Sequence, residues 1–166
     1  MSSTVRGWLI VAGSSLGLLI VAVAMLPAYQ LVVTAEDGQT LWTLPVRPGT
    51  PVVLMYVNSI YRAPTEEFFT LKPAGFMLTK IRSMSEAVLA YNALPAPYRR
   101  EGAFLASPAH AYLPILVLRI GHTGQQRLLV GGKEIPVYDV GEGAQVTVAV
   151  RRVSITSQLA RSVGLR

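Results

Sequence analysis

The chain has 166 residues, of which 51% are hydrophobic and only 14% are charged, and it contains no cysteine. This composition excludes an intrinsically disordered chain, and the absence of thiols excludes disulfides, a thiolate nucleophile, a cysteine metal site and a lipoprotein anchor. The formal net charge of +6 tolerates anionic partners, but the basic residues are scattered, so we expect them to serve mainly as a solubilising surface.

The first segment of interest is an uncharged apolar run over residues 8–26, WLIVAGSSLGLLIVAVAML. As a helix it would extend roughly 28 Å at about 1.5 Å per residue, close to the hydrocarbon thickness of about 30 Å. Trp8 and Tyr29 flank it, where aromatic rings favour the membrane interface. Two interpretations remain open: a transmembrane signal anchor over residues 1–28, which the length of the run favours, or a signal peptide cleaved after Ala24.

The charges that flank this run predict its orientation. Arg6 precedes it, whereas Glu36 and Asp37 follow it, and no Lys or Arg occurs between Pro27 and Val46. The positive-inside rule then places the N-terminus in the cytoplasm. We therefore predict a single-pass protein of the cytoplasmic membrane with an extracytoplasmic body, or a secreted or periplasmic body if the segment is cleaved.

Residues 29–153 are predicted to form one mainly β domain, an antiparallel β-sandwich or a barrel-like domain, because short apolar runs alternate with Gly and Pro turns. The predicted strands lie within 29–46 (a hairpin through Asp37-Gly38), 51–59, 65–72, 75–84, 113–120, 127–140 (a hairpin through Gly131-Gly132) and 141–155.

The segment 85–113 breaks this pattern. It is predicted to be a long loop that contains one short helix, from Glu86 to Asn92, with Ser85 as its N-cap. A longer helix is excluded by Pro95, Pro97, Pro108 and Pro114. Such a loop is expected to be a lid or contact surface, or else a floppy connection. Residues 154–166 are predicted to be a basic, solvated tail.

Polar residues interrupt the strand pattern at 58–67, in the sequence NSIYRAPTEE. Strand alternation places Glu66 and Glu67 on opposite faces, so we expect one to face solvent and the other to face inward or sideways. A partly buried carboxylate needs a partner, and Arg62 is the nearest cation in sequence. This corner either binds a ligand or partner or is only a polar hairpin corner. Its candidate binding residues are Asn58, Ser59, Arg62, Pro64, Glu66 and Glu67.

The same stretch resembles the central motif of domain of unknown function 1850, in which His and Ser are followed by Val, Lys, Pro and acidic residues. Ser59, Pro64 and Glu66 match this motif, Arg62 replaces its Lys, and Asn58 replaces its His. An amide does not titrate near neutrality, so Asn58 can form hydrogen bonds but cannot act as a general base. Members are often encoded beside TAXI-type TRAP transporters. The resemblance therefore implies an accessory protein that contacts the transporter's membrane subunits or its solute-binding protein.

The sequence gives little support for catalysis. His110 and His122 belong to no metal-binding motif, and a set of Ser59, His122 and Asp139 has no nucleophile elbow around it. We predict no catalytic residue, metal or cofactor, and no nucleic-acid partner, because the aromatic residues are not interleaved with a basic stripe. The first hypothesis is thus the transporter accessory. The second is a free-standing periplasmic or cell-envelope module in which Arg62 holds a small anionic ligand. An enzyme is the third.

Overall fold

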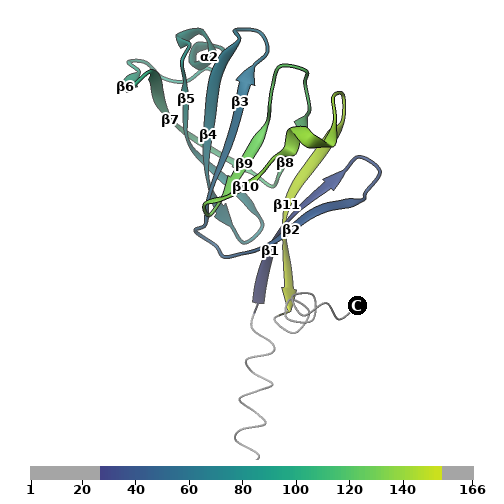
Figure 1. Ribbon diagram of the computed structural model, residues 1–166. Coiled ribbons are helices and arrows are strands. Elements are labelled where there is room, and N and C mark those ends of the chain that lie inside the picture. Colours follow the sequence, from purple (N-terminus) through teal and green to yellow (C-terminus); the bar gives the residue numbers. More distant parts are fainter. Residues whose placement is uncertain (1–26, 155–166) are drawn as a thin grey trace, which may run out of the picture. The chain divides into compact units, whose positions relative to one another are not determined.

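The computed structural model describes residues 27–154, and within them Tyr29–Arg151 form one compact unit (Figure 1). The predicted membrane segment at 8–26 and residues 155–166 of the predicted tail lie outside the described residues. In the described part of the chain, no helix is long and apolar enough to cross a membrane.

Antiparallel β-sheets make up most of this unit, as predicted, with a four-stranded sheet in the order β2-β1-β11-β8 and a seven-stranded sheet in the order β10-β9-β3-β4-β5-β7-β6. The elements are β1 (Pro27–Ala35), β2 (Thr40–Val46), β3 (Pro51–Asn58), β4 (Ala63–Lys72), β5 (Gly75–Ser83), α2 (Glu86–Tyr91), β6 (Arg99–Glu101), β7 (Phe104–Leu113), β8 (Ile115–Arg119), β9 (Arg127–Val130), β10 (Lys133–Ile135), η1 (Val137–Val140) and β11 (Gln145–Ser154).

Both predicted hairpins are confirmed, and glycine provides the backbone geometry at each. Gly38 has φ +86° in the β1–β2 turn, and Gly131 and Gly132 have φ +55° and +89° in the β9–β10 turn. A side chain disfavours these left-handed conformations, which explains why local sequence alone predicted the turns.

One hydrophobic core joins the two sheets. Period-two alternation directs every second side chain of the long strands inward. The four-stranded sheet contributes Leu31, Val33, Leu44, Leu116, Val146 and Val148, and the seven-stranded sheet contributes Val52, Leu54, Phe69, Leu71, Phe76, Leu78, Ile81, Leu128 and Val130. Each such side chain stabilises the fold by roughly 1.5–3 kcal/mol relative to exposure.

The prediction of a loop over residues 85–113 is wrong for the second half of this segment. There β6 and β7 form a hairpin, and β7 pairs with β5. The sequence predicts no strand there: Pro108 excludes a longer helix, and a proline also disfavours a central strand. In the structure Pro108 pairs with Lys80 beside a β-bulge, and it lies beyond the end of β6, whose pairing with β7 reaches only to Ala106. A proline is tolerated at such an unpaired edge position.

The predicted short helix is confirmed as α2, but its predicted cap is not. Ser85 occupies the N-cap position, yet its side chain makes no capping hydrogen bond. Instead its backbone amide donates to Ser83 Oγ at 3.2 Å. Val88 and Leu89 are fully buried, so packing rather than capping holds α2. Within the unit, Figure 1 places α2 and the β3–β4 turn at the end away from the start of β1.

Gly75 is expected to be intolerant of a side chain. A Cβ there would lie 2.5 Å from Leu113 O and 2.9 Å from Pro114 Cα, which are backbone atoms that cannot move cheaply. We expect Gly75→Ala to lower the free energy of unfolding by about 1–3 kcal/mol, measured by chemical denaturation. Gly121→Ala is the matched control, because a Cβ at Gly121 meets no atom within 4 Å. Equal stability of the two variants would contradict the close approach.

Candidate functional site

The predicted corner at 58–67 begins with a turn organised by Asn58. Its Oδ1 accepts hydrogen bonds from the backbone amides of Ile60 at 3.1 Å and Tyr61 at 3.0 Å. Ser59 is exposed, and Arg62 closes the turn with a left-handed φ of 48°. Asn58 therefore has a structural role in the chain, since it satisfies two amides that the strand ladder leaves free.

Pro64 lies inside β4 rather than at a break in the strand. It pairs with Val57, whose amide donates away from β4, to Gly124 O at 2.8 Å. The β3–β4 ladder thus needs no amide at this position, which is why a proline fits there. A buried hydrogen bond between Thr65 Oγ1 and Ser83 Oγ, 3.0 Å long, ties the start of β4 to β5.

An exposed apolar cluster surrounds this corner. Tyr61 and Tyr91 meet edge to face with ring centroids 6.4 Å apart, which joins the turn to α2. Ile60 is 66% exposed, Tyr91 67% and Met84 50%. We call Ile60, Tyr61, Met84 and Tyr91 the apolar cap. Exposed aromatic and Met side chains are enriched in protein contact surfaces.

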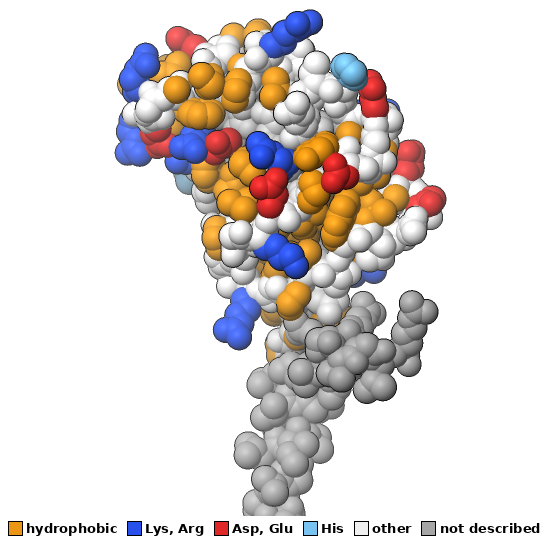
Figure 2. Space-filling view, in the orientation of Figure 1, with side chains coloured by type: hydrophobic (Ala, Val, Ile, Leu, Met, Phe, Trp, Pro, Cys, Tyr) orange, Lys and Arg blue, Asp and Glu red, His pale blue; other side chains and the backbone are white. Residues whose placement is uncertain are grey.

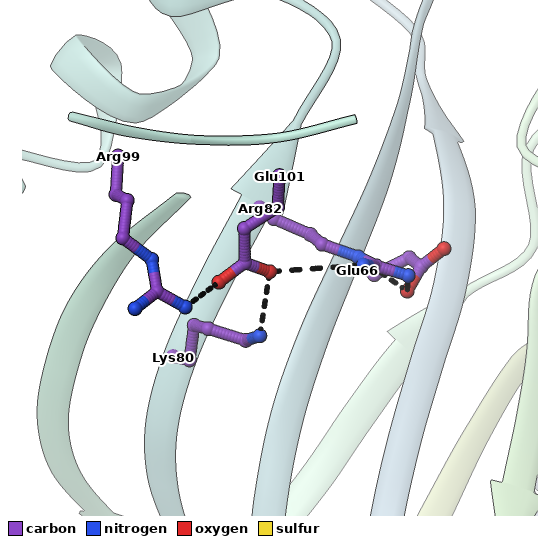
Figure 3. A network of polar contacts seen from close by, with 5 residues as sticks. All are labelled: Glu66, Lys80, Arg82, Arg99 and Glu101. Atoms are coloured by element: carbon purple, nitrogen blue, oxygen red, sulfur yellow. Dashed lines mark hydrogen bonds and ion pairs between the residues drawn. The ribbon is translucent and has the colours of Figure 1, made fainter. Parts of the chain in front are cut away.

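Glu66 points to the outer face of the seven-stranded sheet, where it belongs to an ion-pair network (Figure 3). Its partner is Arg82, directly opposite on β5, with Arg82 Nη2 2.8 Å and Nε 2.9 Å from Glu66 Oε2. The expected pairing of a partly buried glutamate with Arg62 is therefore wrong, because register gives Glu66 a closer cation on β5 and Glu67 accepts from Tyr56. Arg62 forms no ion pair with any described residue.

Glu101 on β6 completes this network. Its carboxylate accepts from Lys80 Nζ at 2.9 Å and from Arg99 Nη2 at 2.6 Å, and these bonds lower the pKa of Glu101 to about 2. Arg82 lies 3.7 Å away and also stacks against Phe68 and Phe104. The charges largely compensate one another, so we interpret the network as a set of ion pairs that link β4, β5 and β6 on the outer face of the sheet. Across the visible face in Figure 2, acidic and basic side chains are likewise interspersed.

Glu67 points the other way, toward the core, as alternation requires. Tyr56 on β3 donates its hydroxyl to Glu67 Oε1 at 2.8 Å. Burial raises the pKa of Glu67, and the hydrogen bond from Tyr56 only partly opposes this effect. Burial and the nearby carboxylate also raise the pKa of Tyr56. The pair thus holds a carboxyl group in an apolar setting with a neutral partner and no cation in hydrogen-bonding contact.

This pair lines a cleft of about 330 Å³ between the two sheets. The seven-stranded sheet contributes Leu54, Tyr56, Glu67 and Leu113, and the other residues are Ile115, Leu116, Val117, Leu118, Arg119 and Gln126. A volume near 300 Å³ is at the lower end for small-molecule sites, and the walls of this cleft expose apolar and polar groups to a similar extent.

Gln126 is the third polar group of the cleft. Its Nε2 donates to Arg119 O at 3.1 Å, which fixes the orientation of the amide. Its Oε1 is buried and has no hydrogen-bond partner, and no other side-chain atom among residues 27–154 shares both properties. An orphan buried acceptor costs roughly 1–3 kcal/mol unless a ligand or water satisfies it.

Backbone hydrogen bonds position this glutamine. Gly124 O accepts from Val57 N at 2.8 Å, and Gln126 O accepts from Tyr138 N at 3.0 Å, so the β8–β9 turn is tied to β3 and to η1. A Cβ on Gly124 would clash with the Gln126 side chain. The absence of a side chain at Gly124 therefore makes room for the amide.

The structure thus divides the predicted site. Asn58, Ser59, Arg62 and Pro64 build the corner, Glu66 belongs to the outer network, and only Glu67 lines the cleft. Sequence reasoning missed Tyr56 and Gln126. Alternation along β3 and β4 was the available signal for Tyr56, but no local pattern marks Gln126.

The histidines add no further site. His122 Nδ1 lies 3.1 Å from Glu142 Oε2 on an exposed surface, and His110 is exposed on β7 rather than in a loop. Among the described residues no three His, Asp or Glu side chains come close enough to hold a metal ion.

Comparison with known proteins found no matching family model, no matching curated protein and no matching solved structure. The resemblance to domain of unknown function 1850 therefore stays a prediction that depends on the motif residues.

The stability of the protein is expected to depend on the protonation of Glu67. Because its pKa is raised on folding, the native state holds this proton more tightly than the unfolded chain, and the resulting stability is lost as the pH rises through the folded pKa. Glu67→Gln keeps an acceptor for Tyr56 without the charge. We expect it to match the wild type near pH 4 and to exceed it by on the order of 1 kcal/mol near pH 8, measured by thermal denaturation.

Glu66→Gln is the matched control, since it changes the neighbouring carboxylate on the opposite face and removes the partner of Arg82. It should lower the melting temperature near pH 8. A constant difference between Glu67→Gln and the wild type across this pH range would contradict the buried, charge-penalised environment.

Proposed function

We propose that this chain is a membrane-anchored extracytoplasmic β-domain, a two-sheet sandwich in architecture, that binds a small molecule in the cleft beside Glu67. The observation that carries the proposal is the orphan acceptor Gln126 Oε1 in the same cleft as the half-buried carboxyl of Glu67. A polar atom buried without a partner is costly, so a fold that keeps one in the same cleft as an inward-facing carboxyl has a use for it.

Binding rather than catalysis is the proposed activity. The cleft offers a carboxyl, a phenol and an amide. The described contacts show neither a nucleophile next to a base nor a pair of backbone amides that could form an oxyanion hole in it. The location outside the cytoplasm rests on the apolar run at 8–26 and the charges around it.

Native mass spectrometry of the full-length chain tests the proposed binding. We expect a small molecule of less than about 300 Da to be released on denaturation of the wild-type protein, a mass that fits a cleft of this size. Leu118→Trp, which fills the cleft, should release none. Leu129→Trp is the matched control, because Leu129 lies on the opposite face of the seven-stranded sheet from Leu128 and outside the cleft. The proposal would be refuted if neither the folded wild type nor folded Leu129→Trp released a small molecule.

A role beside a TAXI-type TRAP transporter is the second proposal, and the apolar cap is the observation that favours it. A surface that joins Ile60 and Tyr61 to Met84 and Tyr91 suits a protein partner, since aromatic and Met side chains are enriched in interfaces. The motif resemblance supplies the partner: the transporter's membrane subunits or its solute-binding protein.

Affinity purification from gently solubilised membranes tests this role, with the transporter subunits co-expressed. We expect near-stoichiometric recovery with the wild type and at least a roughly tenfold loss with the double variant Tyr61→Ser/Tyr91→Ser, because exposed interface aromatics commonly dominate binding. Tyr112→Ser is the control, since Tyr112 is 50% exposed on β7, outside the apolar cap. Equal recovery with all variants would exclude the apolar cap as the contact surface.

A further inference from the structure

The hydrogen-bonding groups of the cleft are unequally divided between acceptors and donors. Tyr56 uses its only proton on Glu67 Oε1, which leaves the phenolic oxygen free to accept. The second oxygen of Glu67 has no hydrogen-bond partner among the described residues, and Gln126 Oε1 has none either. Gln126 Nε2, in contrast, already donates to Arg119 O. While Glu67 is ionised, the inner side chains thus present three unused acceptor oxygens against one unused donor, the second amide proton of Gln126.

The charges of the lining also favour a ligand that donates hydrogen bonds. Glu67 and Arg119 carry the formal charges of the lining, since Tyr56 and Gln126 are neutral. Glu67 is half-buried, whereas Arg119 is exposed and its Nη2 lies 3.5 Å from Gln145 Oε1 on β11. Water screens an exposed charge more than a half-buried one, so the carboxylate contributes more to the potential inside the cleft than the guanidinium does. A cation would relieve the burial penalty on Glu67, and an anion would increase it.

The rest of the lining determines the body of the ligand. Leu54, Leu116 and Leu118 make the inner wall, and Ile115 and Val117 lie exposed at the rim on the short edge strand β8. This apolar part of the wall favours a compact hydrocarbon or aromatic group, because burial of apolar surface is favourable, whereas the further polar lining residue Arg119 is exposed.

Resting on the proposed binding function of the cleft, we infer that its ligand class is the small amphipathic amine: a protonated amine that donates to Glu67 and Gln126, attached to an apolar body that packs against the leucines. Three ammonium protons match the three free acceptors of Glu67, Tyr56 and Gln126. This assignment differs from an anion held at Arg62, which lies on the β3–β4 turn and not in the cleft lining.

Three probes of nearly equal shape test the ligand class on the full-length chain in lipid nanodiscs: 2-phenylethylamine, 2-phenylethanol and 3-phenylpropanoate. Dissociation constants are read from NMR shifts of Tyr56 and Gln126, which report occupancy of the cleft, and from the free probe concentration measured in each sample, which corrects for partition into lipid. We expect the amine to bind roughly tenfold more tightly than the alcohol, which corresponds to one charge-assisted hydrogen bond, and the anion to bind most weakly.

Two variants separate the role of the carboxylate from general effects on the fold. Glu67→Gln should reduce the preference for the amine over the alcohol to less than about threefold, while Glu66→Gln, on the opposite sheet face, should leave it unchanged. Gly124→Ala, which displaces the Gln126 side chain, should weaken binding of the amine by roughly threefold, although the variant leaves the charge of the cleft unchanged. Circular dichroism establishes that each variant is folded.

The outcomes distinguish the ligand class from the proposed function. If the alcohol or the anion binds as tightly as the amine, or if folded Glu67→Gln keeps the preference, the amine assignment is overturned and binding in the cleft stands. If no probe shifts the cleft resonances, the amine assignment is overturned as well. The released-molecule experiment then decides separately whether the cleft binds any ligand.

Discussion

Neighbouring side chains of a β-strand lie on opposite faces of the sheet, and in β4 this constraint separates Glu66 from Glu67. The outward Glu66 meets Arg82 at 2.8 Å, in a network that satisfies its charge. The inward Glu67 meets only the neutral phenol of Tyr56. The two residues are chemically identical, yet the charge of the first is balanced within the fold, whereas the burial penalty on the second is only partly offset by Tyr56. That asymmetry is what makes the core side of the sheet, rather than its outer face, the candidate site.

A buried carboxyl becomes useful only where a ligand can reach it, and the edge of the smaller sheet provides the access. Strand β8 pairs on one side only, with β11, so the sheets do not close over Glu67 at this edge. The following turn then returns toward β3, where Gly124 O accepts the amide of Val57 and brings Gln126 beside the carboxyl. The cleft therefore arises from a short edge strand and a tethered turn, two features that cost little core packing.

Local sequence signals predicted the parts of the fold that local forces determine. The Asp37-Gly38 turn, the hairpin at Gly131-Gly132 and the opposite faces of Glu66 and Glu67 follow from backbone geometry alone. The predictions failed where partners come from distant strands. Arg82 replaces Arg62 as the partner of Glu66 through the β4–β5 register, and Pro108 fits into β7 only because β6 is short. Gln126 could not be predicted, because its role depends on the tethered turn and on the space that Gly124 leaves.

The corner and the cleft are adjacent along β3, and this bears on how a motif residue can influence binding without touching a ligand. Asn58 fixes the turn directly after Val57, and Val57 holds the turn that carries Gln126. Tyr56, the partner of Glu67, precedes Val57 in the same strand. A change at Asn58 that loosens the end of β3 would therefore reach two of the three polar groups of the cleft through one short backbone segment. The amide of Asn58 suits this positioning role, because the two lone pairs of its oxygen accept from two backbone amides at once.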